Sequence, residues 1–357
     1  MSNNLHLYPM VLKQLCQWLP EERITRKRNL ALLMSGLYRA RAVHLSFIVR
    51  HWPLPGKLPS LVNRLRRFLD NSRVEVQTYY RPLAQRLINT FADTELRLVI
   101  DCSAVGLHHR VLTVSVAYRK RTLPLAWSFH QGKKGNITAV EQIELLQWVH
   151  SLLPEQQTVW LLGDSGFNSV VLLRWLRKAR WHFVIRSSGH PKVCLDSKIW
   201  EKLGQLSLRA GQTRVIGWVR LTQKHDYGPV WLVLHWSQEK EEPWYLFSDQ
   251  AGEKTVLKLY KLRMWTEEMY GDLKKHGFDL ESTHLQNCQR LSRLMLGVSL
   301  VYVWFVALGS FVVKRGCRHL IDCKARRDKS YFRLGWDWMD RCTRLNLPWN
   351  LRFYPYL

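Results

Sequence analysis

Acidic residues are scarce in this sequence. Its 357 residues include 28 Asp and Glu against 54 Lys and Arg, which gives a formal net charge of +26 at pH 7. An excess of positive charge on this scale is typical of proteins whose partner carries many negative charges. Nucleic acid is therefore the favoured partner, and an anionic membrane surface is the alternative.

Closely spaced cysteine pairs are absent. The seven cysteines are odd in number and form no Cys-x-x-Cys motif, so the sequence predicts neither a zinc knuckle nor a disulfide framework. A reducing interior fits this pattern. The first residues, MSNNLHLYPMVLKQL, lack a charged start followed by a long apolar run, and we therefore expect no signal peptide.

Long uncharged runs are rare, and the one that matters is Leu294 to Val313, with basic residues on both sides. This run is long enough to span a membrane. Its flanking charges give no orientation, and a single span would leave the long basic portion before it unexplained. We therefore expect a helix buried against a central sheet, and we do not expect a membrane partner.

Positive charge is concentrated at the two ends of the chain. Residues 1–90 hold 15 basic and 4 acidic residues, and residues 314–357 hold 11 and 4. Both ends are expected to bind a polyanion. The middle of the chain, in which acidic and basic residues are closer to equal in number, is expected to carry out the chemistry. Hydrophobic residues make up 46% of the chain, which is ample for a sizeable core.

The hydrophobic pattern predicts helices first and then strands. Residues 26–48 and 61–69 carry apolar residues at helical spacing, which favours a small basic helical domain or, alternatively, a helical cap on the core. Short apolar runs then indicate strands at 96–103, 111–118, 122–130, 158–167 and 181–187. A helix follows the capping pair Thr138 and Glu141, and another follows the fourth strand. This is the order of elements in a ribonuclease-H-like α/β sheet.

Two aspartates end apolar strands. Asp101 lies in LRLVIDCS and Asp164 in TVWLLGDSGF. In open α/β sheets, chemistry gathers at the carboxyl ends of strands. A carboxylate followed there by small residues is poorly explained by packing, because buried carboxylates are rare unless they are paired or bind a metal. The alternative interpretation is an Asp that caps a turn.

A third carboxylate lies in the stretch YKLRMWTEEMYGDLKKH. Four of its polar residues are spaced at intervals of three, four and seven, namely Tyr260, Arg263, Glu267 and Lys274. On an α-helix these side chains lie within about 60° of one another, whereas Glu268 points about 80° or more away. We predict one long helix here that ends at Gly277. The alternative is a solvated helix face with ordinary surface ion pairs.

Together, these elements suggest phosphodiester chemistry. Two-metal catalysis needs carboxylates from separate elements, and Asp101, Asp164 and Glu267 meet that need as predicted catalytic residues and metal ligands. Mg²⁺ suits such a site, with Mn²⁺ as a substitute, because it binds through a few carboxylates, waters and substrate phosphate. The other members of the spaced motif are predicted to contact DNA phosphates: Tyr260, Arg263 and Lys274.

The chain resembles the DDE transposases of bacterial insertion sequences, specifically the group called insertion sequence family four. That group's signature is Tyr, two residues, Arg, three residues, Glu, six residues, Lys, and this sequence reproduces it without a gap. The two aspartate blocks look like LVIDCS and LLGDSGF here. Ser103 and Ser165 depart from the family habit, which has Thr and a basic residue at these places; these changes would affect the grip on phosphate without removing a metal ligand.

The resemblance implies a ribonuclease-H-like catalytic core with a β-rich insertion, preceded by a small helical basic domain. The expected segments are a helical DNA-binding domain (1–90), the first part of the core (91–187), the β-rich insertion (188–250), core helices with the catalytic Glu (251–313) and a basic C-terminal tail (314–357).

The same resemblance implies cut-and-paste transposition, with metal-dependent cleavage at terminal inverted repeats and strand transfer into target DNA. A homodimer on paired double-stranded DNA ends, in the bacterial cytoplasm and associated with the nucleoid, is expected. Some relatives excise through a DNA hairpin, stabilised by an aromatic residue that stacks on a flipped base; Trp231, Trp236 and Trp244 are candidates, unless they are core residues. The alternative function is a catalytically inactive or repurposed DNA-binding protein of the same fold.

Overall fold

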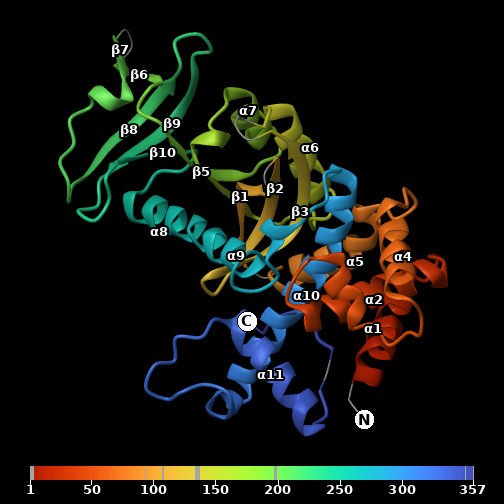
Figure 1. Cartoon of the computed structure of the whole chain (residues 1–357). Helices are drawn as coiled ribbons and strands as arrows, with labels where there is room; N and C mark the ends of the chain where they lie inside the picture. The colour runs from red at the N-terminus through yellow and green to blue at the C-terminus, as the bar shows by residue number, and fades with distance from the viewer. Residues whose placement is uncertain are drawn as a thin grey trace.

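The computed structural model describes residues 4–92, 94–106, 108–132, 137–196, 199–349 and 351–356. The lysine-containing loop GKKGN, at 132–136 between the third strand and the next helix, lies outside the described residues except for Gly132. Figure 1 shows N-terminal helices on one side of a central sheet, further strands at the opposite end, and the C-terminal helix α11 below.

Ten strands in the described residues form one sheet, in the order β3-β2-β1-β4-β5-β10-β9-β8-β6-β7. Its first half contains all five strands expected for the core: β1 (Leu96–Val105), β2 (His109–Tyr118), β3 (Arg121–Gln131), β4 (Val159–Gly163) and β5 (His182–Ser187). The strands β1, β2 and β3 pair antiparallel, whereas β4 runs parallel to both β1 and β5. The mixed α/β sheet and the order of its first five strands along the chain are confirmed.

Two short helices connect the parallel strands. Helix α6 (Ala139–His150) begins at the predicted capping box, in which the Thr138 hydroxyl accepts from the backbone N–H of Glu141 and the Glu141 carboxylate accepts from that of Thr138. Helix α7 (Val170–Lys178) begins at Ser169, whose hydroxyl caps the backbone N–H of Leu172. These side chains satisfy backbone donors that an uncapped helix end would leave unpaired.

The predicted insertion is present, but it continues the core sheet instead of standing apart. Its strands are β6 (Lys192–Asp196), β7 (Ile199–Lys202), β8 (Thr213–Leu221), β9 (Tyr227–His235) and β10 (Trp244–Ser248). The last of these pairs antiparallel with β5 through the register Tyr245↔Ser187 to Ser248↔Val184. Backbone hydrogen bonds therefore cross the boundary that was drawn at residue 187.

The N-terminal helices share one core with the sheet. They are α1 (Asn4–Trp18), α2 (Ile24–Ala40), α3 (Leu45–Arg50), α4 (Leu58–Asp70) and α5 (Val76–Thr90). Arg293, a buried residue of α10 (Cys288–Lys314), donates to the backbone carbonyls of Leu69 and Val74, and the Tyr80 hydroxyl donates to the Pro124 carbonyl of β3. Helical structure over 1–90 is confirmed, but these contacts do not separate it from the core as an independent domain.

Helix α10 is the central helix of the molecule. By length and hydropathy it is the one helix among the described residues that could cross a membrane, and 89% of its most apolar window is buried inside this chain. Its neighbours are β3, α2, α4, α5 and α11 (Tyr331–Leu345). Its apolar surface is therefore covered by the protein's own elements.

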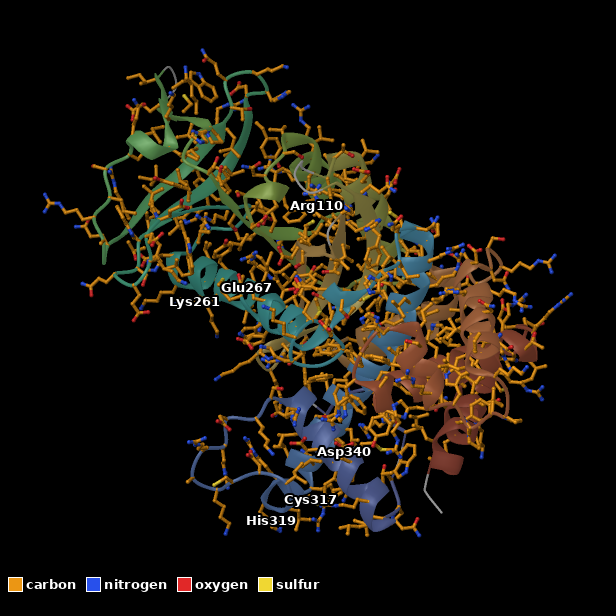
Figure 2. The ribbon with its side chains drawn as sticks, viewed as in Figure 1. Arg110, Lys261, Glu267, Cys317, His319 and Asp340 are labelled. Carbon is orange, nitrogen blue, oxygen red and sulfur yellow. The ribbon has the colours of Figure 1, made fainter. Side chains whose placement is uncertain are left out.

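The C-terminal segment is folded, which corrects the expectation of a basic tail over 314–357. Helix α11 buries Phe332, Trp336 and Met339 against the core, while its polar side carries Asp340. That carboxylate accepts a hydrogen bond from Tyr38 of α2 at 3.0 Å and forms an ion pair with Arg41. Figure 2 labels Asp340 on this helix.

The long helix predicted over 260–276 is two helices. Helix α8 (Glu253–Arg263) ends just before Met264, and α9 (Trp265–Leu273) begins just after it. Helix α8 packs on β4 and β5, whereas α9 packs on β1, β2 and β3, so two parts of a twisted sheet direct the two helix axes differently. The predicted end at Gly277 is also wrong, because α9 already ends at Leu273 and Gly277 lies in the following turn. A Cβ added to Gly277 would lie 2.2 Å from the Asp272 carbonyl oxygen, so the glycine allows a close approach of the backbone.

Candidate active site

Asp101 lies within β1, opposite Thr113 of β2, and the prediction that it ends its strand is wrong, because pairing with β2 continues for four more residues to Val105. Its side chain faces α8 and α9 and is buried, with 5% of the residue exposed. Burial raises the pKa of this carboxyl to about 6, against the lowering effect of the nearby Arg263 guanidinium. A carboxylate in such a place requires a cationic partner, since removal from water disfavours its charged form.

Asp164 follows β4 directly, as the sequence predicted. One carboxylate oxygen accepts the backbone N–H of Gly166 at 2.9 Å and caps the short turn Ser165–Phe167. The other oxygen lies 3.6 Å from Nη2 of Arg263. The alternative interpretation of Asp164 as a turn cap is therefore correct for one oxygen, while the second oxygen remains directed at the site.

Glu267 is in the first turn of α9 and is half exposed. Helix α9 is anchored beneath it by buried residues on its other faces, among them Met269 and Tyr270. The Tyr270 hydroxyl donates to the backbone carbonyl of Asp101 at 3.3 Å and hydrogen-bonds Thr113 at 2.8 Å. These contacts fix α9 against β1 and β2. Figure 2 shows Glu267 on this helix, beside the sheet.

Arg263 joins the three carboxylates. Its guanidinium lies 3.1 Å from Asp101 Oδ1, 3.6 Å from Asp164 Oδ2 and 2.9 Å from Glu267 Oε1. Residues that are far apart in sequence thus converge on one positively charged group. The Arg263–Glu267 pair is the i, i+4 ion pair of the alternative interpretation, a solvated helix face with surface ion pairs. The other two partners of Arg263, Asp101 and Asp164, place this arginine inside the site instead.

The donor set fits a divalent cation. Three carboxylates supply the oxygen ligands that Mg²⁺ prefers, and their convergence on a guanidinium marks a position favourable to positive charge. In this conformation no three His, Cys, Asp or Glu side chains among the described residues are arranged to hold a metal ion. The guanidinium of Arg263 lies between the carboxylates, in the place where a cation held by them would sit.

Tyr260 lies elsewhere than predicted. It is 1% exposed and packs edge-on against Trp244, with ring centroids 4.8 Å apart, in an apolar cluster under α8. Burial raises the pKa of its phenol to about 12. A direct contact between its side chain and a DNA phosphate is therefore not available in this conformation, because the turn of α8 that carries Tyr260 faces the sheet.

Lys274 is the residue that follows the end of α9. Its backbone angles, φ −97° and ψ −120°, are not helical, so its side chain does not lie on one helix face with Glu267. Its ammonium group forms an ion pair with Glu281 at 2.9 Å. The residue remains beside the site, and its predicted phosphate contact stays a prediction.

One exposed aromatic residue escaped the sequence reasoning. Trp218 of β8 is 48% exposed and packs edge-on against the predicted candidate Trp231, whereas Trp244 packs under α8. Trp236 donates its indole N–H to the Lys240 carbonyl within a turn. Strand alternation could have singled out Trp218, but the irregular register between β8 and β9 near Gly217 hides which face it takes.

A family comparison decides the identity of this domain. The sequence profile described as transposase DDE domain matches residues 101–304, more than half of the chain, and this range contains all three carboxylates of the site. The chain belongs to the DDE transposase family. DDE transposases act as polynucleotidyl transferases and generally use divalent metal ions.

The other comparisons concern curated proteins and solved structures. No curated protein matches this DDE transposase at a significant level. Among solved structures, a piggyBac transposase synaptic complex with hairpin DNA is similar to it with a TM-score of 0.46 and 13% sequence identity, and the match covers 98% of this chain and 83% of that chain.

Proposed function

We propose that this protein is a transposase of the insertion sequence family four type, which cleaves DNA at terminal inverted repeats and transfers the released strands into target DNA. The observation that carries the proposal is the convergence of Asp101, Asp164 and Glu267, from three separate elements, within the region that matches the DDE domain. Double-stranded DNA as the partner accords with the net charge of +26.

The three carboxylates would hold two divalent ions. When bound there, Mg²⁺ or Mn²⁺ supplies activation of the attacking oxygen and stabilisation of the leaving oxygen. Asp101 is held by the pairing of its strand with β2 and by burial under α8 and α9, and Asp164 is oriented by its bond to Gly166. Glu267 is the more exposed ligand and lies on a helix. The site therefore combines two fixed donors with one that can adjust.

Arg263 has two roles in this proposal. Without metal it balances the negative charge of the three carboxylates. With cations held by the three carboxylates, its guanidinium would be free to bind a phosphate of the DNA, for which its planar donors are well suited. The buried Tyr260 supports the packing of α8 under Arg263 and is a positioning residue in this scheme.

Cleavage of a labelled duplex that carries the element's own terminal repeat tests this proposal. Glu267→Gln should reduce Mg²⁺- or Mn²⁺-dependent cutting at least about a hundredfold, because a neutral amide is a much weaker metal ligand than a carboxylate. Glu268→Gln is the matched control. It is the next residue on α9 and equally exposed, but it pairs with Arg121 at 3.1 Å instead of with Arg263.

Normal cutting by both variants would show that the site is assigned to the wrong carboxylates. Wild-type protein that binds the repeat but never cuts it, with either metal, would instead establish a DNA-binding protein that has lost its activity.

A further inference from the structure

The segment between α9 and α10 lines a groove that no catalytic residue occupies. Residues Thr283 to Gln286 form part of two adjoining cavities, of about 430 and 310 Å³. The first is closed on its other side by α3 and α4, and the second by the turn between β1 and β2. We call this feature the crossing groove. His284 and Gln286 are exposed along it.

The crossing groove is connected to the candidate active site. The turn at Gly106 ends β1, the strand that carries Asp101, and a Cβ added there would lie 3.7 Å from the carbonyls of Glu281 and Thr283. Glu281 in turn pairs with Lys274 at the end of α9. Asp101 and Gly106 are five positions apart along the chain, about 16 Å in an extended strand, which equals roughly five base-pair steps of B-DNA.

The groove carries uncompensated positive charge. Its two nearby acids already have partners, because Asp70 forms a two-point ion pair with Arg290 and Glu281 pairs with Lys274. Arg66 is exposed on the groove wall, and its recorded hydrogen bond goes to the neutral side chain of Asn63. In the described part of the chain, no carboxylate pairs with Arg66.

A row of planar side chains begins inside the groove, where His44 and His284 line it, and continues past its edge to Phe47. The ring of His44 lies 4.9 Å from that of His284 and 5.2 Å from that of Phe47, and the Arg50 guanidinium covers the Phe47 ring at 5.4 Å. Phe47 is 44% exposed. A ladder of rings that ends in an arginine suits the sugar and phosphate surface of DNA, since it offers both apolar contact and charge.

We propose that the crossing groove binds the backbone of the DNA duplex beyond the bond that is cleaved, with Arg66 on a phosphate and Phe47 and His284 against the neighbouring sugars. The proposal rests on the proposed function, since it concerns the same DNA molecule. It assigns to α3, α4 and the 283–287 segment the task of fixing the duplex relative to the catalytic carboxylates.

The test measures binding of labelled duplexes without metal by fluorescence anisotropy. One duplex carries the terminal repeat and extends past the cleaved bond on both sides, and a second stops at that bond on the side that would enter the groove. Arg66→Glu should weaken binding of the long duplex about tenfold and lower its salt slope by about 1 or more, while binding of the short duplex stays as in wild type.

Arg67→Glu is the matched control, because Arg67 is the next residue on α4, is exposed and does not line the groove. His284→Glu, on the opposite wall, should reproduce the effect of Arg66→Glu. Equal losses for Arg66→Glu and Arg67→Glu, or a loss that is the same on both duplexes, would overturn the assignment.

The outcomes also separate this inference from the proposed function. Wild-type protein that cuts the repeat while the Arg66 and His284 variants bind both duplexes normally refutes the groove alone. Wild-type protein that binds neither duplex refutes the proposed function as well. Thermal unfolding of each variant shows that its fold is intact, which is expected because both side chains are exposed.

Discussion

Charged residues beneath α9 show how single side chains hold the candidate active site in place. Asp272 is buried and accepts a hydrogen bond from Nε of Arg121 at 2.7 Å, and the same guanidinium pairs with Glu268. Burial raises the pKa of Asp272 to about 6, against the lowering effect of Arg121. The folded protein therefore binds a proton on Asp272 more tightly than the unfolded chain does.

This difference predicts a pH effect on stability. As the pH rises from about 4 to about 6, the unfolded chain releases this proton first, so the stability contributed by the protonated carboxyl is lost over that range, by about 3 kcal/mol at most. Asp272→Asn cannot ionise and lacks the effect. Urea unfolding of both proteins should show the wild type losing stability relative to the variant as the pH rises. A wild-type free energy of unfolding that stays constant or rises relative to that of the variant would contradict the assignment.

At the scale of elements, α10 and α11 cross at a pair of glycines. A Cβ added to Gly335 would lie 1.9 Å from the Phe305 carbonyl oxygen, and one added to Gly309 would lie 1.8 Å from that of Tyr331. Backbone therefore meets backbone, and no side chain can move aside to make room. This close approach lets the aromatic residues of both helices, among them Phe305 and Trp336, pack around the crossing.

Gly335→Ala should destabilise the protein by about 1–3 kcal/mol or more, because the two helices must separate to admit the methyl group. Gly271→Ala, inside α9, is the control. Its added Cβ meets only the side chain of His276, at 3.2 Å, and Ala favours a helix over Gly by up to about 1 kcal/mol. Chemical denaturation should show a lower midpoint for the first variant and an unchanged or higher midpoint for the second; equal midpoints would argue against the backbone crossing.

Across the whole molecule, the chemistry and most of the net positive charge lie in different parts. The candidate active site is at the sheet, whereas the strongly basic ends of the chain form α1 to α5 and the region of α11, on the side of the molecule away from the insertion (Figure 1). Electrostatic binding of DNA is therefore expected to depend on many phosphates and little on any single carboxylate.

The affinity for duplex DNA should fall about a thousandfold or more between about 50 and 200 mM salt, as for a protein that contacts six or more phosphates. Glu267→Gln should keep this salt slope while it loses cleavage. Binding titrations at several salt concentrations measure both quantities, and a weak salt dependence would show that the basic ends do not contact the DNA.

The local pattern of the sequence determined much of this protein. Period-two and helical spacing were enough to predict the five core strands, the capping box at Thr138 and the place of Asp164 directly after its strand, because these depend on neighbours within a few residues. The Arg263–Glu267 pair was also predictable, since residues four apart meet on any helix.

Tertiary structure alone decided the rest. The break at Met264, the burial of Tyr260 and the fold of the C-terminal segment depend on which part of the sheet or which helix each stretch meets, and sequence spacing holds no information about such distant partners. The same reason applies to the site itself. Arg263 and Asp101 are 162 positions apart, and only the folded sheet brings them within 3.1 Å of each other.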